Sequence, residues 1–143
     1  MPTRTARTAW NGTLQTGSGQ VELSSSKLGT YEVSFPKRAA AEAGGQTSPE
    51  ELIAAAHAAC FSMALSNGLG QAGHAPEELK TSATVTFQPG EGITKIALAV
   101  AGKVPGMDDN AFQEAAKTAK ENCPVSKALA AVPEISLSAR LES

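Results

Sequence analysis

The stretch Ser48-Pro-Glu-Glu-Leu-Ile-Ala-Ala-Ala-His-Ala-Ala-Cys60-Phe-Ser-Met-Ala-Leu65 decides the fold of this chain. Ser48 is placed to cap a helix, and Pro49 suits the first helical position because the missing N–H of proline has no helical partner there. Glu51 follows Ser48 by three residues and completes a capping box. The pattern therefore predicts a long helix over about residues 49–67.

This helix carries apolar side chains on every side. Residues 52–65 are Ala, Leu, Ile, Phe and Met with few interruptions, and Gly68 is suited to a left-handed cap at the end. A helix that is apolar all round must be buried on all sides. In a chain of 143 residues this is easier if a second subunit covers the side that its own sheet leaves open. We therefore predict a homodimer.

The remainder of the chain changes its pattern several times, which predicts an α+β fold. Turn signals such as Asn11-Gly12 and Gly17-Ser-Gly19 divide the first 35 residues into short strands, and strict alternation of apolar residues marks later strands. A flexible connection is expected over 39–47 and a hairpin turn over 88–92. We expect strands near 6–14, 20–26, 31–35, 82–88, 93–104 and 135–141, a helix over 109–121 with Phe112, Ala115, Ala116 and Ala119 inside, and a short helix after Pro124.

Composition excludes several classes of protein. The length fits one domain over residues 1–143, and the net charge of −2 with scattered Lys and Arg does not favour nucleic acid or an anionic membrane surface. The apolar run within 52–65 is expected to be too short to span a bilayer, and the first residues lack the apolar core of a signal peptide. We therefore expect a cytoplasmic protein, in which cysteine pairs are more often catalytic or redox-sensing than structural.

Cys60 and Cys123 are the only two cysteines, and their settings favour reactivity. Cys60 lies in the long helix. Cys123 precedes a proline at the expected start of another helix, where unpaired backbone N–H groups stabilise a thiolate. Because free cysteine is also a common buried apolar residue, and because 62 residues separate the two, spacing alone does not establish a redox pair.

His57 and Glu50 allow more than one interpretation. His57 lies three residues before Cys60 and could serve as a base for a Cys-His hydrolase, but a core histidine bonded to a nearby acceptor is more common. With His74 the two histidines and two cysteines equal a zinc set in number, although their spacing follows no known ligand pattern. Glu50 is not needed for the cap, and it is either functional or simply solvated.

Several segments together resemble the OsmC/Ohr family of thiol peroxidases. These are the stretch Thr47–Leu65 around Cys60, then Ile93-Thr-Lys-Ile-Ala-Leu98, Val104-Pro-Gly-Met107 and Cys123-Pro-Val-Ser126. The similarity covers nearly the whole chain in the right order and is greater to the OsmC branch (osmotically inducible protein C). The resemblance implies an intertwined homodimer in which antiparallel sheets wrap around two long central helices. It also implies a role in oxidative and osmotic stress.

The resemblance also implies a mechanism and its residues. Cys60 would attack the O–O bond of a hydroperoxide as a thiolate and become a sulfenic acid. Cys123 would resolve it to a disulfide that an external dithiol reduces, such as that of a lipoyl protein. Arg38, in Ser34-Phe-Pro-Lys-Arg38, occupies the place of the functional arginine, held by Glu50. A guanidinium would lower the pKa of the attacking thiol and stabilise the leaving oxygen. No metal or organic cofactor is implied.

Helix geometry suggests where Glu50 acts. Glu50 and Cys60 are ten residues apart, which is about 15 Å along one helix, too far for both to reach one arginine within a chain. If the long helices of a dimer run antiparallel, Glu50 of one subunit lies near Cys60 of the other. The alternative to a peroxidase is a redox sensor or small-ligand-binding protein that uses the same thiols without turnover.

Overall fold

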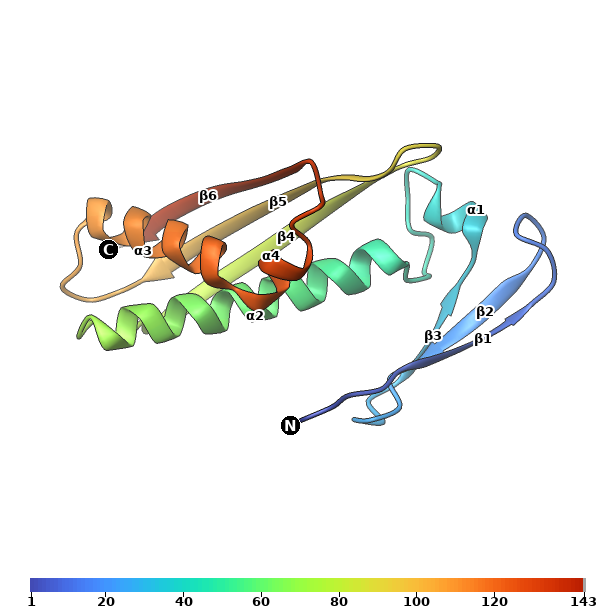
Figure 1. Ribbon diagram of the computed structural model, residues 1–143, viewed down its shortest axis with the longest axis horizontal. Helices are drawn as coiled ribbons and strands as arrows, with labels where there is room; N and C mark the ends of the chain where they lie inside the picture. Colours follow the sequence, from blue (N-terminus) through green and yellow to red (C-terminus); the bar gives the residue numbers. More distant parts are fainter. Residues whose placement is uncertain (143) are drawn as a thin grey trace. The chain divides into compact units, whose positions relative to one another are not determined.

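The computed structural model describes residues 1–142, and they form two compact units. The first covers residues 1–52 and the second begins at residue 53. The chain order is three strands, a one-turn helix, the long helix, a strand hairpin, two helices and a last strand (Figure 1). The expected α+β fold is confirmed. The assignment of residues 1–143 to a single domain stays a prediction.

The first unit is an antiparallel meander followed by a short helix. Strands β1 (Arg7–Asn11), β2 (Ser18–Glu22) and β3 (Thr30–Val33) pair in sequence order, as their turn signals predicted. Helix α1 (Phe35–Arg38) follows β3 directly and was not predicted. Its start is nonetheless a local sequence signal, because Ser34 caps it and Pro lies in its first turn.

The second unit contains a three-stranded sheet in the order β4-β5-β6. Strands β4 (Glu78–Gln88) and β5 (Gly92–Lys103) form the predicted hairpin, although β4 begins four residues earlier than expected because it pairs with β5 as far as Lys103. Strand β6 (Glu134–Glu142) runs parallel to β5. The expectation of purely antiparallel sheets is therefore wrong for this edge, where two helices intervene between β5 and β6 and return the chain to the same end of the sheet.

Helix α2 (Pro49–Gln71) is the longest element and crosses the boundary between the units. It begins where the cap predicted, but it continues through Gly68, so the predicted end at residue 67 is wrong. The reason is packing: four fully buried residues recur at intervals of four, and the last lies beyond the glycine. They are His57, Phe61, Leu65 and Leu69.

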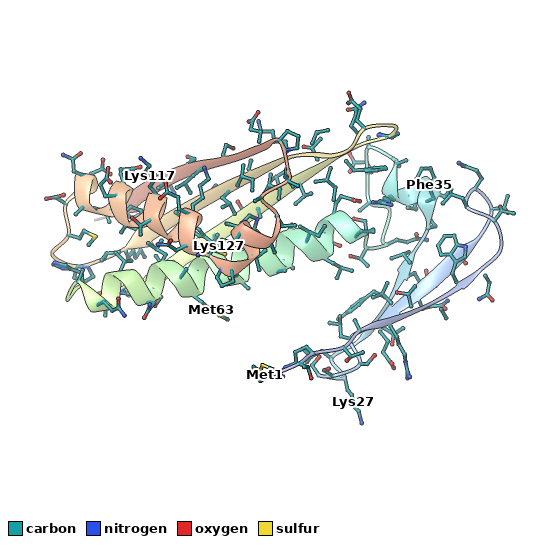
Figure 2. The ribbon with its side chains drawn as sticks, viewed as in Figure 1. Met1, Lys27, Phe35, Met63, Lys117 and Lys127 are labelled. Atoms are coloured by element: carbon teal, nitrogen blue, oxygen red, sulfur yellow. The ribbon has the colours of Figure 1, made fainter. Side chains whose placement is uncertain are left out.

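Another side of α2 carries exposed apolar residues in its unit. Met63 is 72% exposed, and in Figure 2 it points away from the sheet of its unit. At 23 residues the whole helix is long and apolar enough to cross a membrane by length and composition, although the apolar run within 52–65 alone is shorter than a span. One stripe of the helix packs against β5 and α3 of its own chain.

Helices α3 (Asp109–Asn122) and α4 (Pro124–Ala128) complete the second unit. Asp108 caps α3 by accepting from the N–H of Ala111. The inner face of α3 shares one core with α2 and β5. Gly102 of β5 is required there, because a Cβ would lie 2.7 Å from the ring of Phe112. The core comprises Phe61, Leu65, Leu69, Ile96, Leu98, Val100, Val104, Phe112, Ala116 and Ala119.

Candidate functional site

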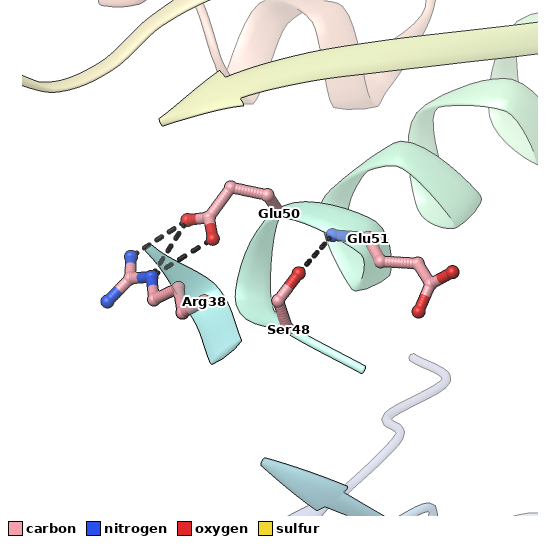
Figure 3. Close-up of polar contacts among 4 residues, drawn as sticks. All are labelled: Arg38, Ser48, Glu50 and Glu51. Atoms are coloured by element: carbon pink, nitrogen blue, oxygen red, sulfur yellow. Dashed lines mark hydrogen bonds and ion pairs between the residues drawn. The ribbon is translucent and has the colours of Figure 1, made fainter. Parts of the chain in front are cut away.

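Arg38 and Glu50 form a two-pronged ion pair (Figure 3). Arg38 Nε lies 3.0 and 3.2 Å from the two carboxylate oxygens, and Arg38 Nη2 lies 2.8 Å from Glu50 Oε2. Glu50 is only 7% exposed. The hydrogen bond from Glu50 raises the pKa of Arg38, so the guanidinium is held permanently charged and in one orientation. The pairing expected from the resemblance is thus present within one chain.

Local structure brings the two residues together. Arg38 ends α1, which turns the chain at the end of β3, and Glu50 lies in the first turn of α2. Between them the chain folds back, because Ser34 Oγ donates to Gln46 Oε1 at 2.8 Å and the N–H of Thr47 donates to the carbonyl of Glu32 at 3.0 Å. Arg38 and Glu50 are therefore fixed by the backbone on either side of this loop.

The predicted capping box is only half formed. Ser48 Oγ accepts from the N–H of Glu51 at 3.1 Å, as predicted (Figure 3). The Glu51 carboxylate, however, accepts from Thr47 Oγ1 at 2.6 Å. Glu51 has a structural role at the start of α2, which leaves Glu50 as the carboxylate available to Arg38.

Cys60 and Cys123 lie side by side in the second unit although 62 residues separate them in sequence. Both are free thiols, and their side chains are hydrogen-bonded to each other. Cys60 is half-buried on α2, whereas Cys123 is fully buried at the junction of α3 and α4. The structure therefore brings together the two sulfurs that the sequence singled out.

Within the second unit alone, the pKa of Cys60 is raised and that of Cys123 is lowered. Burial and the adjacent Cys123 raise the pKa of Cys60. Burial also acts to raise the pKa of Cys123, but hydrogen bonds from Cys60, from the backbone of Val125 and Ser126 and from the Ser126 hydroxyl lower it overall. The Cys123 side chain nonetheless makes no capping hydrogen bond at the start of α4, so the expected role of the helix N–H groups stays a prediction. A lowered pKa at Cys60 needs a cation from outside this set of groups.

His57 is a buried core residue, in line with the more common interpretation. Its Nε2 lies 2.7 Å from Ser126 Oγ, and burial lowers the pKa of the ring. His74 is separate, with Nδ1 3.3 Å from the carbonyl of Pro105. Among residues 1–142 no group of three or more His, Cys, Asp or Glu side chains could hold a metal ion.

Two cavities were not foreseen from the sequence. One of about 330 Å³ lies within the first unit and has a mainly apolar wall with Arg38 at its edge. Its lining includes Trp10, Leu14, Val21, Val33, Phe35 and Leu52. The other, of about 720 Å³, is a groove between α2 and α3 that opens onto Cys60. The strands of the first unit are four or five residues long, too short for alternation to reveal a cavity wall.

Known proteins with similar sequences indicate the family. The family model described as OsmC-like protein matches residues 42–138. The chain belongs to the OsmC family. It is 45% identical to peroxiredoxin OsmC of Escherichia coli strain K12 over 94% of this chain and 93% of that protein. It is 32% identical to an organic hydroperoxide resistance protein of Xanthomonas axonopodis pv. citri over 74% and 75% of the two chains.

Solved structures of OsmC-like proteins share the fold. An organic hydroperoxide resistance protein from Elizabethkingia anophelis aligns with a TM-score of 0.71 over 99% of both chains at 24% identity. The matched range of the OsmC family includes Glu50, Cys60 and Cys123, whereas Arg38 lies four residues before it. The resemblance expected from the cysteine motifs is confirmed.

Proposed function

We propose that this protein is a cysteine-based peroxidase. Its substrates are organic hydroperoxides and also hydrogen peroxide. The observation that carries this proposal is the direct contact between Cys60 and Cys123. The relatives named peroxiredoxin OsmC and organic hydroperoxide resistance protein support it. No bound metal or organic cofactor is required, because two thiols supply the two electrons.

The reaction has two steps on the enzyme. The Cys60 thiolate attacks one oxygen of the hydroperoxide, the O–O bond breaks, and the alkoxide leaves with a proton as an alcohol or water. Cys60 is then a sulfenic acid. The Cys123 thiolate attacks this sulfur, hydroxide leaves as water after protonation, and a disulfide remains. Cys60 is suited to the first step because it opens onto a groove, and Cys123 to the second because it is fully buried.

Arg38 supplies the cation that Cys60 lacks within its own unit. Since Glu50 holds Arg38 in the same chain and lies about 15 Å from Cys60 along α2, we infer that this pair serves Cys60 of a second subunit. The exposed apolar sides of α2, including Met63, would then form the centre of an intertwined dimer. The apolar cavity beside Arg38 would hold the organic part of the hydroperoxide.

The reaction needs an external reductant. A dithiol, such as that of a lipoyl protein, would attack the disulfide and restore both thiols. We expect it in the cytoplasm, where thiols are kept reduced, with the whole chain acting as one domain in an oxidative or osmotic stress response.

Turnover separates this proposal from a redox sensor or ligand-binding protein with the same thiols. With excess cumene hydroperoxide and dihydrolipoamide, the wild-type protein should consume many equivalents of peroxide per subunit. A sensor would consume about one equivalent and stop, because one pair of thiols supplies two electrons. Consumption that ends at one equivalent with each reductant tested, thioredoxin and glutathione included, would contradict the peroxidase and favour the sensor.

Replacing Arg38 should weaken Cys60 as a nucleophile. Arg38→Ala should raise the pKa of Cys60 and slow its oxidation at pH 7 by about tenfold or more, because a cation near a thiol favours the thiolate. The measurements are thiolate absorbance against pH in the Cys123→Ser background and the rate of sulfenic acid formation. Arg7→Ala is the matched control, since Arg7 pairs with Glu22 at 2.7 Å on the protein surface. An unchanged pKa with an unchanged rate would remove Arg38 from the site.

A further inference from the structure

Buried polar side chains lie between His57 and the resolving cysteine. His57 Nε2 lies 2.7 Å from Ser126 Oγ. Ser126 is in the first turn of α4, three residues after Cys123, and its hydroxyl acts to lower the pKa of that thiol. His57 is fully buried and Ser126 is 8% exposed. Buried polar side chains require hydrogen-bond partners. A purely apolar core would not need a histidine and a serine beside the Cys123 sulfur.

Counting protons assigns a direction to each hydrogen bond. A serine hydroxyl has one proton to donate. Ser126 acts to lower the pKa of Cys123, which is the effect of a hydroxyl whose proton points toward the sulfur. Ser126 Oγ must then accept from His57, which places the ring proton on Nε2.

The surroundings of the other ring nitrogen, Nδ1, also favour a proton on Nε2. His57 Nδ1 is buried and has no hydrogen-bond partner within residues 1–142. In the assigned tautomer Nδ1 is an acceptor without a proton. In the opposite tautomer, or in the charged ring, it would be a buried N–H donor without a partner, which costs the desolvation free energy of that donor. Burial accordingly lowers the pKa of His57 and keeps the ring neutral.

We propose that His57 and Ser126 are positioning residues for Cys123, with neutral His57 donating through Nε2 to Ser126 Oγ and Ser126 donating to the Cys123 thiolate. This inference rests on the proposed function and extends it to the resolving half of the cycle. His57 and Ser126 hold the Cys123 sulfur as a thiolate while this sulfur attacks the Cys60 sulfenic acid. The S–S bond forms as the S–O bond breaks, and hydroxide leaves as water after protonation.

The same contacts serve the reduction of the disulfide. Cys123 is fully buried, whereas Cys60 opens onto the groove between α2 and α3. A thiolate of the external dithiol therefore attacks Cys60 Sγ, and the electron pair of the S–S bond leaves on Cys123, where Ser126 donates to it. The second thiol of the reductant then displaces Cys60 and closes the reductant's own disulfide, so two electrons pass to the enzyme.

A titration without peroxide tests the serine. In the Cys60→Ser background Cys123 is the one remaining thiol. Adding Ser126→Ala should raise the pH at which its thiolate absorbance is half-developed by about one unit, a tenfold loss of thiolate below that pH, because a hydrogen bond to a charged group is removed. Ser62→Ala is the matched control, since Ser62 Oγ bonds to Ala58 and Thr81 instead. An unchanged midpoint in the Ser126→Ala protein would overturn the proposal.

Two measurements test the histidine. Nitrogen NMR of the wild-type protein should show the His57 proton on Nε2 and none on Nδ1; the opposite tautomer would overturn the proposal even if no variant folds. Among variants with both cysteines, His57→Phe should slow the conversion of sulfenic acid to disulfide about tenfold and favour overoxidation. His57→Gln, which keeps an N–H donor, should restore most of the rate, and equal defects in both variants would count against donation by His57.

The proposed function can fail independently of this inference. If the wild-type protein forms no sulfenic acid with peroxide, the peroxidase is wrong, yet the titration of Cys123 still decides whether Ser126 stabilises its thiolate. If the wild-type protein forms the disulfide and Ser126→Ala leaves the titration unchanged, the positioning role alone is wrong.

Discussion

Cys60→Ser should abolish peroxide reduction, lowering the turnover rate by roughly a thousandfold or more, as removal of a nucleophile does in other enzymes. A serine hydroxyl at its ordinary pKa is not a useful nucleophile toward an O–O bond here. The fold should survive, because Cys60 is half-buried and serine is of similar size. The measurement is peroxide consumption with a dithiol, with circular dichroism as the check on folding.

Cys123→Ser is the matched control for this prediction, because it removes the other thiol. It should still consume about one equivalent of peroxide per subunit, then stop as a sulfenic acid and overoxidise with further peroxide. A Cys60→Ser protein that turns over normally, or a Cys123 that reacts first with peroxide, would reverse the assigned roles.

Mixing two inactive variants should restore activity if the site is shared between subunits. Glu50→Ala leaves Arg38 without its carboxylate partner, and Cys60→Ser lacks the nucleophile. In a mixed dimer, one site combines the intact Arg38 and Glu50 of the Cys60→Ser chain with the intact Cys60 of the other chain. Random exchange at equal concentrations should therefore return about a quarter of the wild-type activity, since half of the dimers are mixed and each has one complete site.

The control for this experiment is subunit exchange itself, measured by native mass spectrometry with one variant isotope-labelled. Each variant alone should remain inactive after the same incubation. If mixed dimers form and no activity returns, Arg38 and Glu50 act on Cys60 of their own chain, and helix α2 would have to break between Glu50 and Cys60. A protein that stays monomeric would exclude the shared site directly.

Local signals predicted the start of α2 but not its end. The Ser48-Pro49 cap depends on neighbouring backbone groups, so sequence is sufficient to place it. Gly68 was a reasonable place for the helix to stop, yet the helix continues because Leu69 is fully buried in the core. A tertiary contact therefore overrides the low helix propensity of glycine at this position.

The site was predictable to different degrees. The motif around Cys60 identified the family and with it the pair with Cys123, which the structure brings into contact. Arg38 and Glu50 are twelve residues apart and join through a loop, which periodicity cannot reveal; the resemblance supplied that pair. Ser126 lies in the same motif as Cys123, but its bond to His57 spans 69 residues and depends on the packing of α4 against α2.

A single turnover followed by mass spectrometry of the intact and the digested protein tests the central claim most directly. The reduced wild-type protein is mixed with one equivalent of cumene hydroperoxide per subunit, quenched with an alkylating agent and digested. We predict that each subunit loses two hydrogen atoms, that Cys60 and Cys123 are joined in one disulfide, and that one equivalent of cumyl alcohol is released. Full alkylation of both cysteines with the peroxide unconsumed, or an oxygen retained on Cys60 with no disulfide formed, would contradict the account.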